Sequence, residues 1–356
     1  MKIGILTFVG TQSHGACLQA YALKEAAREL GSEVDIINYH CEKIDSVKNE
    51  KFILKGKSLK KHIGAILKRP IYRNRFSKFE EFEKKMLGLE RIVTREEMDG
   101  LYDRIIVGSD QIWNTEITGN DFTYFLDNVT DSKKKLSYAA SLGIDFFPKD
   151  SEEKCISLIN RFSKVNVREN SLKDYLSSKL NKDISCVIDP TQLISREKWD
   201  DIAGEIPLES GEYMFVHAPN ESVSEWEIIY RIARENNFKI IYQTNKIYRK
   251  KGCKCLYCVS PTEYLNYIKF SKYVVTGSFH TLSFSLIFGR NFLCTDSMVK
   301  GRNSRLSNLL EIAGCSDRMT FNADNVKNVS IDYKNVRKRL KLTSDCSREK
   351  LKEMLK

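Results

Sequence analysis

The chain has 356 residues, 42% hydrophobic and 29% charged, a composition typical of an ordinary soluble globular protein. This length exceeds a comfortable single core and predicts two domains, while no apolar stretch reaches the roughly 18–20 residues that span a bilayer. The ten cysteines are scattered, which argues against a disulfide framework and favours a reducing, cytoplasmic location.

The net charge of +11 is concentrated in one segment. Residues 48–78 contain eleven lysines and arginines and a single acid, Glu50, so this segment alone carries +10. A local basic stretch indicates a local anionic partner, such as a phosphate, a diphosphate, an acidic membrane surface or nucleic acid. A solvated helical arm is the alternative that the sequence leaves open.

The first forty residues predict a βαβ unit. Lys2–Phe8 is a short apolar run, Gly10–Gly15 is a loop of small residues, and Ala16–Leu30 carries apolar residues at helical spacing. Gly31 ends that helix, and Val34–Ile37 is the next strand. A crossover of this length implies parallel pairing.

Residues 41–100 look irregular and are interpreted as a basic helical insert with an amphipathic helix over Phe76–Leu87. The insert would interrupt an N-terminal Rossmann-like domain over residues 1–200. The further strands expected in this domain are Arg104–Val107, Leu136–Ala139, Val165–Val167 and Ser185–Ile188.

A second alternating set begins near residue 212 and predicts a C-terminal Rossmann-like domain over residues 201–330. Gly204, Pro207 and Gly211 place the hinge in 195–211, and the lysine-rich residues 331–356 predict a terminal basic helix. The predicted fold class is therefore α/β, with two Rossmann-like domains of parallel sheets facing each other across a cleft. The strands expected in the second domain are Tyr213–Val216, Lys239–Tyr242, Tyr273–Val275 and Asn291–Cys294; the helices are Ser224–Glu235, Pro261–Ile268, Thr281–Phe288 and Ser304–Ala313.

Ligands of open parallel sheets bind beyond the carboxyl ends of the strands. Almost every predicted strand is followed by small or polar residues, and several of these residues are titratable. The candidate binding residues found in this way are Ser13, His14, Gly15, Ser109, Asp110, Gln111, Arg168, Asn170, His217, Ser278 and His280.

Three of these positions allow two interpretations each. The loop Gly10–Gly15 is either an anion cradle at a helix start or a tight turn, and it lacks the G-x-G-x-x-G pattern. Arg168 ends a buried strand, where its guanidinium suits a phosphate or carboxylate, unless Glu169 pairs with it. Asp110 suits a sugar hydroxyl or the orientation of a base, unless it or Ser109 caps a helix.

His280 is the strongest candidate for catalysis. It sits between a strand and a helix among small polar residues, in Thr276-Gly277-Ser278-Phe279-His280. A histidine facing a ligand there can give and take a proton near neutral pH, whereas a lone histidine is more often a satisfied core residue. No Ser-His-Asp or Cys-His set is evident.

Cys253, Cys255 and Cys258 have a metal-like spacing. They offer three sulfurs without an obvious fourth ligand, whereas structural zinc takes four. We therefore predict a loop with incidental thiols and no metal.

Several sequence blocks together resemble the polysaccharide pyruvyl transferase family. In order along residues 1–320 these are GILTF, HGACLQAYAL, DRIIVGSDQIWN, SYAASLG, VREN, VIDPTQL, VVTGSFHTLSFSLIFG and GRNSRLSNLLEIAG. The resemblance implies a fold like the GT-B glycosyltransferases, with the active site in the interdomain cleft. It also implies transfer of pyruvate from phosphoenolpyruvate onto a sugar as a ketal, with no metal or redox cofactor.

The resemblance also implies roles for two residues. Arg168 falls on the family's arginine in its R-E/D-N-S-like motif and would grip the phosphoenolpyruvate anion. His280 falls on the family's motif histidine, and protonation of the enol methylene followed by hydroxyl addition requires an acid and base of this kind. Asp110 is the second residue predicted to take part in catalysis.

Two positions depart from the family pattern. Where many members have Arg-Leu-His, this chain has Ser278-Phe279-His280, so Arg302 or Arg305 would have to supply the positive charge. The family's usual Asn-Tyr-Gly is here Ser13-His14-Gly15, which brings His14 into the expected site.

The basic residues 48–78 gain a hypothesis from this resemblance. Capsule and cell-wall sugars are often built on lipid diphosphates at the inner membrane face, where each clustered lysine or arginine contributes about 1 kcal/mol to binding. Peripheral membrane docking beside a lipid-linked glycan acceptor is therefore one prediction.

Two other functions compete with pyruvyl transfer. A glycosyltransferase that uses a nucleotide sugar would need the same two-domain architecture. A non-catalytic polyanion-binding protein would use residues 48–78 alone. Nucleic acid is the least favoured partner, because the chain lacks aromatic interleaving and any recognisable nucleic-acid module.

Overall fold

The computed structural model describes residues 1–50, 59–219, 221–296, 302–319 and 330–356, with the backbone alone for 47–50, 59–67 and 302. The chain divides into two compact units. The first unit comprises Met1–Leu193 with Ser344–Lys356, and the second comprises Ile194–Thr343. None of the described helices is long and apolar enough to cross a membrane.

The first unit is built on a six-stranded sheet in the order β2-β1-β3-β4-β5-β6, with every neighbouring pair parallel. A cluster of buried apolar side chains from the sheet and its helices surrounds Trp113 and Phe125, whose rings stack at 6.0 Å. The strands are β1 Lys2–Leu6, β2 Glu33–Ile36, β3 Arg104–Val107, β4 Lys135–Ala140, β5 Lys164–Val167 and β6 Ile184–Cys186.

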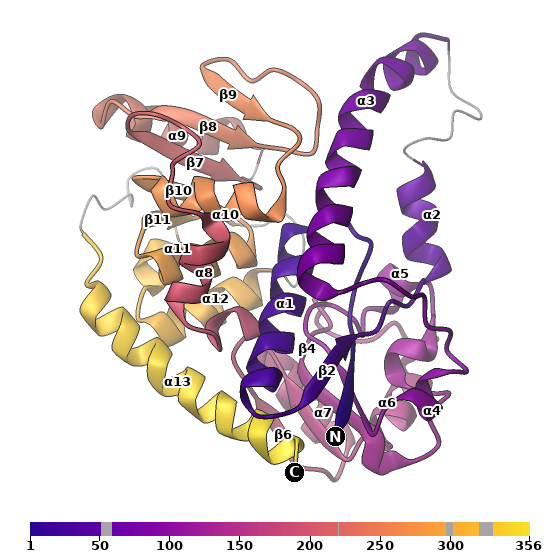
Figure 1. Cartoon of the computed structure of the whole chain (residues 1–356). Helices are drawn as coiled ribbons and strands as arrows, with labels where there is room; N and C mark the ends of the chain where they lie inside the picture. Colours follow the sequence, from indigo (N-terminus) through magenta and orange to yellow (C-terminus); the bar gives the residue numbers. More distant parts are fainter. Residues whose placement is uncertain (51–58, 220, 297–301, 320–329) are drawn as a thin grey trace. The chain divides into compact units, whose positions relative to one another are not determined.

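Helices of the first unit connect these parallel strands (Figure 1). Ser13 is the N-cap of the first helix, and its hydroxyl accepts a hydrogen bond from the amide of Ala16. This bond satisfies one of the backbone amides in the first helical turn that have no partner within the helix. The helices are α1 His14–Glu29, α2 Glu42–Glu50, α3 Leu59–Phe82, η1 Glu83–Leu87, α4 Met98–Leu101, α5 Thr115–Thr118, η2 Phe122–Phe125, η3 Ser132–Lys134, α6 Glu152–Asn160, α7 Asn170–Lys179 and η4 Pro190–Gln192.

The second unit is built on a five-stranded sheet in the order β11-β10-β7-β8-β9, again with parallel pairs only. A core centred on Met214, Val216 and Trp226 lies beneath it. The strands are β7 Tyr213–His217, β8 Lys239–Gln243, β9 Cys253–Leu256, β10 Tyr273–Thr276 and β11 Asn291–Cys294; the helices are α8 Arg196–Ala203, α9 Val223–Glu235, α10 Pro261–Phe270, α11 Phe279–Phe288, α12 Arg302–Ala313 and η5 Ser316–Arg318.

The terminal helix α13 (Tyr333–Met354) contributes to both units. Its start packs in the second unit, where the Tyr333 hydroxyl donates to the carbonyl of Ser285 at 3.4 Å. Its end packs in the first unit, where the Ser347 hydroxyl accepts from the amide of Ile188 at 3.0 Å. The sequence predicted this terminal helix but not its packing. A lysine-rich pattern does not show which unit the apolar residues of the helix pack against.

The predicted fold class, α/β with parallel sheets in two halves, is confirmed. All ten strands expected from the sequence are present, with bounds within about two residues of the prediction. One strand, β9, was missed, because it runs through the cysteine-rich segment that was interpreted as a loop.

The helical insert predicted for residues 41–100 is present, but it is more extensive than the one helix expected over Phe76–Leu87. Two helices, α2 and α3, occupy much of this segment, and the expected helix Phe76–Leu87 is only the end of α3 with the turn η1. Lysines and arginines are good helix formers, and α3 continues through Pro70, which is exposed. Gly88 ends the segment in a left-handed conformation.

All ten cysteines lie in the described ranges, and none of them forms a disulfide. Within the ranges that the structure describes, no group of three or more His, Cys, Asp or Glu side chains is arranged to hold a metal ion.

Replacing Gly108 by alanine is expected to destabilise the protein strongly. Gly108 has a φ of +130°, and a Cβ there would overlap the carbonyl oxygen of Tyr138 in the neighbouring strand β4. The strain of the backbone and the overlap together should lower the free energy of unfolding by more than about 3 kcal/mol, measured by urea unfolding.

Gly31→Ala is the matched control for this substitution. Its φ is +89°, but no atom lies within 4 Å of the added Cβ. We expect a loss of about 1–2 kcal/mol there, from the left-handed backbone alone. Equal losses in the two variants would contradict the assignment of Gly108 as a position of close strand approach.

Candidate functional site

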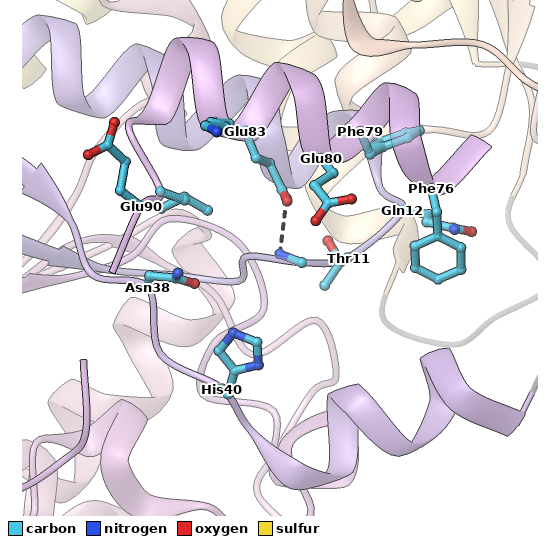
Figure 2. Close-up of a pocket in the computed structure, with 12 residues that line it drawn as sticks. Thr11, Gln12, Asn38, His40, Phe76, Phe79, Glu80, Glu83 and Glu90 are labelled. Carbon is cyan, nitrogen blue, oxygen red and sulfur yellow. Dashed lines mark hydrogen bonds between the residues drawn. The ribbon is translucent and has the colours of Figure 1, made fainter. Parts of the chain in front are cut away.

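A cavity of about 520 Å³ opens in the first unit beside the loops that follow β1 and β2 (Figure 2). The end of α3 and the turn η1 form one wall, and the loop Gly10–Gln12 faces them. Glu83 projects from that wall, and its carboxylate accepts a hydrogen bond of 3.0 Å from the amide of Gly10. The lining residues are Gly10, Thr11, Gln12, Asn38, His40, Phe76, Phe79, Glu80, Glu83, Lys84, Leu89 and Glu90.

The loop predicted as an anion cradle already binds an anion of its own chain. The amide of Gly10 binds the carboxylate of Glu83, and the Ser13 hydroxyl caps helix α1. His14 is buried, with its ring 4.9 Å from that of Phe79, and Gly15 lies in the first turn of α1. The tight-turn interpretation therefore describes this loop better than the cradle.

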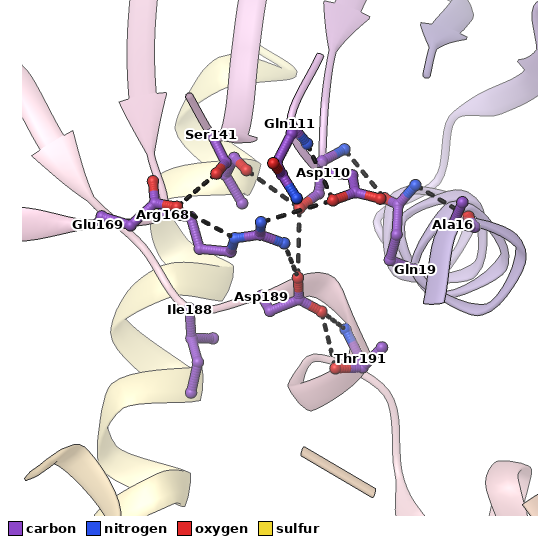
Figure 3. Close-up of polar contacts among 12 residues, drawn as sticks. Ala16, Gln19, Asp110, Gln111, Ser141, Arg168, Glu169, Ile188, Asp189 and Thr191 are labelled. Atoms are coloured by element: carbon purple, nitrogen blue, oxygen red, sulfur yellow. Dashed lines mark hydrogen bonds and ion pairs between the residues drawn. The ribbon is translucent and has the colours of Figure 1, made fainter. Parts of the chain in front are cut away.

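A buried ion cluster lies at the carboxyl edge of the first sheet (Figure 3). The guanidinium of Arg168 is only 2% exposed and lies between three carboxylates. The nitrogen–oxygen distances are 2.9 Å to Asp189, 3.6 Å to Asp110 and 3.8 Å to Glu169. These residues follow β6, β3 and β5, so the cluster joins three strand ends.

Hydrogen bonds of Ser109 and Ser141 extend this cluster. The Ser109 hydroxyl donates to Asp189 at 3.3 Å, and its amide donates to the side chain of Gln19 at 3.0 Å. The Ser141 hydroxyl donates to Glu169. Three of the predicted residues, Ser109, Asp110 and Arg168, are thus brought together, as the strand-end rule indicated.

The electrostatics of the cluster favour a structural role for Arg168. Burial lowers the pKa of Arg168, but the charges of Glu169, Asp189 and Asp110 outweigh it, so the pKa is raised and the guanidinium stays charged. One cation among three carboxylates leaves an excess of negative charge, which repels a further anion. The salt-bridge alternative therefore fits the geometry, while a grip on phosphoenolpyruvate stays a prediction.

Asp189, Gln19 and Ser141 belong to this network but were not among the predicted site residues. Asp189 lies three residues after β6 and directly follows the expected strand Ser185–Ile188, so the strand-end rule could have found it. Gln19 lies inside α1, and nothing in the local sequence signals its contact with Ser109.

A second constellation lies at the carboxyl edge of the second sheet. Strands β10, β7 and β8 end in register at Thr276, His217 and Gln243. The Nδ1 atom of His217 is 2.6 Å from the hydroxyl of Thr281, which lies 2.8 Å from the hydroxyl of Tyr264. Burial raises the pKa of Tyr264, so this chain ends in a protonated hydroxyl.

His280 precedes Thr281 in the first turn of α11. It is 9% exposed, and its ring packs edge to face on that of Phe279 at 5.2 Å. Ser278 caps the helix, because its hydroxyl accepts from the amide of Thr281 at 3.5 Å. His217, Ser278 and His280 are thus brought to one edge, whereas Thr281 and Tyr264 were missed because their partners are distant in sequence.

Three buried oxygens mark this edge as a polar surface. They are Oε1 of Gln243, Oγ1 of Thr295 and Oδ1 of Asp296, and none of them has a hydrogen-bond partner in the described part of the chain. A buried polar atom without a partner costs about 1–3 kcal/mol. Hydroxyl groups of a bound ligand would satisfy these acceptors.

Four predicted residues remain. The amide of Gln111 donates to Asp110 at 2.9 Å, its side chain packs against Gly143, and Asn170 begins α7. Arg305 is buried in α12. The side chain of Arg302 lies outside the described residues.

A model of the polysaccharide pyruvyl transferase family matches residues 14–297, most of the chain, including both strand-edge constellations. The chain belongs to the polysaccharide pyruvyl transferase family. Membership indicates a transferase that acts on polysaccharide. No curated protein matches the sequence significantly.

Solved structures support the fold of this pyruvyl transferase family member. A putative UDP-N-acetylglucosamine 2-epimerase from Listeria monocytogenes superposes with a TM-score of 0.51 at 13% identity, over 99% of this chain and 90% of that one. An O-GlcNAc transferase mutant from Thermobaculum terrenum gives 0.52 at 11% identity, over 100% and 66%. At this identity the likeness shows the fold alone, which is of the GT-B type, as predicted.

Replacing Arg168 by methionine should destabilise this pyruvyl transferase family member by about 3–5 kcal/mol, because three buried carboxylates lose their cation. Arg196→Met is the control, since Arg196 is 40% exposed and pairs with Asp200 at 3.2 Å. Loss of that surface pair should cost less than about 1 kcal/mol in urea unfolding. A small effect at Arg168 would show that the cluster does not hold the three strand ends.

Proposed function

We propose that the protein transfers pyruvate from phosphoenolpyruvate onto a sugar of a polysaccharide or lipid-linked precursor and forms a ketal. The observation that carries this proposal is the family match over residues 14–297. His280 supplies a chemical centre for it, because it stands beside a hydrogen-bonded chain at a strand edge where ligands of such sheets bind.

The reaction needs one proton delivered and two removed. A proton added to the enol methylene makes a methyl group, and a sugar hydroxyl adds to the neighbouring carbon. The bond between that carbon and the phosphate oxygen then breaks, and a second hydroxyl of the sugar adds to the same carbon to form the ketal. One hydroxyl proton balances the new methyl group, and the other leaves with phosphate.

His280 is assigned as the acid and base of these steps, since an imidazole exchanges protons near neutral pH. His217 is assigned a positioning role. Its Nδ1 is fixed by Thr281, the residue after His280, which aligns the two histidines on adjoining elements.

Asp110 is proposed as a positioning residue rather than a proton carrier. Its carboxylate accepts from the amide of Gln111 at 2.9 Å and lies 3.6 Å from Arg168. Both contacts fix the orientation of its carboxylate beside the strand ends.

His280→Ala should lower the turnover of phosphoenolpyruvate by about 10²–10⁴-fold, because general acid–base catalysis is lost. Acceptor-dependent phosphate release is the measurement, with galactosyl, mannosyl and glucosaminyl acceptors. His280→Gln should be equally impaired, since an amide keeps hydrogen bonding but carries no titrating proton.

Ser285→Ala is the matched control in the same helix. Its hydroxyl donates back to the carbonyl of Thr281 at 2.7 Å within the same helix, so turnover should be nearly unchanged. Release that survives in His280→Ala would remove this residue from the mechanism. Consumption of a nucleotide sugar instead of phosphoenolpyruvate would overturn the proposed reaction.

Peripheral contact with an anionic membrane through residues 48–78 is a further part of the proposal. Much of this segment lies outside the described side chains. Of the arginines that are described, Arg75 turns inward and donates to the carbonyl of Gln12 at 2.8 Å, whereas Arg73 is exposed.

Arg73→Glu should weaken sedimentation with acidic liposomes at low salt, and Arg75 contributes little to docking by this account. Replacing one cation by an anion near the surface should cost about 2 kcal/mol, from about 1 kcal/mol per charge. Equal sedimentation of the wild type with acidic and neutral liposomes would contradict docking.

A further inference from the structure

We infer that the cavity of the first unit binds a sugar unit of the acceptor that carries no negative charge, and that it does not hold the anionic donor. This inference rests on the proposed function for the identity of its ligand as an acceptor. The binding site itself is argued from the cavity.

The size and place of the cavity suit a small ligand. Its volume of about 520 Å³ falls within the roughly 300–1,000 Å³ of small-molecule pockets. It is lined by Gly10–Gln12 after β1 and by Asn38 and His40 after β2. Ligands of parallel sheets bind beyond such strand ends.

The charge of the lining excludes phosphoenolpyruvate. Glu80, Glu83 and Glu90 stand against one cation, Lys84, among the lining residues. His40 is held by Asp45, with 2.9 Å between Nδ1 and the carboxylate. An anion that carries both phosphate and carboxylate would be repelled, whereas a neutral or amine-bearing sugar would not.

The polar groups of the loop offer both donors and acceptors. The amide nitrogen and oxygen of Gln12 and the hydroxyl of Thr11 are buried, and none has a hydrogen-bond partner among the residues described. A sugar hydroxyl both donates and accepts, so one sugar can satisfy the two ends of an amide. Leaving these atoms unsatisfied is costly, which favours occupation.

The walls distinguish this cavity from a metal site. Phe76 and Phe79 line it and give apolar surface for a sugar ring, which a hydrated cation does not use (Figure 2). The carboxylates are spread along the wall, and no cluster in the described ranges has the arrangement to hold a metal ion.

The test measures the binding of methyl glycosides to the full chain in the absence of phosphoenolpyruvate, by ligand-observed NMR or calorimetry. The glycosides of galactose, mannose and glucosamine are compared with that of glucuronic acid. At least one of the first three should bind, and the glucuronide should bind at least about tenfold more weakly.

Two variants and one matched control locate the binding. Glu80→Gln should weaken the glucosaminide about tenfold, because the ammonium group of the sugar loses a facing negative charge. Gln12→Leu should weaken every bound glycoside about tenfold, because the sugar loses hydrogen bonds to the side-chain amide. Glu81→Gln is the control, since Glu81 is exposed on the same helix and does not line the cavity.

Four results would overturn the inference. They are no binding of the three glycosides to the wild type, binding of the glucuronide as tightly as the others, Glu80→Gln behaving like Glu81→Gln, and Gln12→Leu binding like the wild type.

Phosphate release separates this inference from the proposed function. If the glycosides bind in the cavity but no phosphate is released from phosphoenolpyruvate, the binding site is supported and the proposed function is rejected. If phosphate is released and the KM for the acceptor is unchanged in Gln12→Leu, the proposed function is supported and the binding site is rejected.

Discussion

Parallel pairing is the constraint on which the rest of this structure depends. Every strand pair in both sheets is parallel, so each strand ends at the same edge as its neighbours. Loops that leave this edge carry polar residues, because buried backbone and helix starts there need hydrogen-bond partners. Residues far apart in the chain, such as Asp110 and Asp189, therefore meet around Arg168 at this edge.

The two edges meet this constraint in different ways. In the first unit, the guanidinium of Arg168 forms ion pairs with three carboxylates, so the charges at this edge are paired within the protein. In the second unit, His217, Thr281 and Tyr264 form a hydrogen-bonded chain beside buried oxygens that have no partner among the described residues. The first arrangement stabilises the fold, and the second leaves hydrogen-bonding capacity for a substrate. This contrast is why we place the chemistry on His280 rather than on Arg168.

Much of this could be predicted from the sequence. Apolar runs separated by helical stripes indicated ten of the described strands, and the strand-end rule found Ser109, Asp110, Arg168, His217 and His280. The partners of Arg168 were underestimated, because Glu169 was the only carboxylate near it in sequence. The cavity was missed for a related reason. Glu80 and Glu83 face the Gly10 loop only because the end of α3 packs over it. A hydrophobic pattern in the sequence does not reveal contacts between residues that are 73 positions apart, such as Gly10 and Glu83.

The most direct test of the central claim, pyruvyl transfer with protonation of the enol methylene, is the reaction of phosphoenolpyruvate and acceptor in D₂O. NMR of the isolated product measures the label. The account predicts a ketal whose methyl group carries one deuterium from solvent and whose neighbouring carbon bears two sugar oxygens. A product that retains the methylene double bond, or one that contains no carbon from phosphoenolpyruvate, would contradict it.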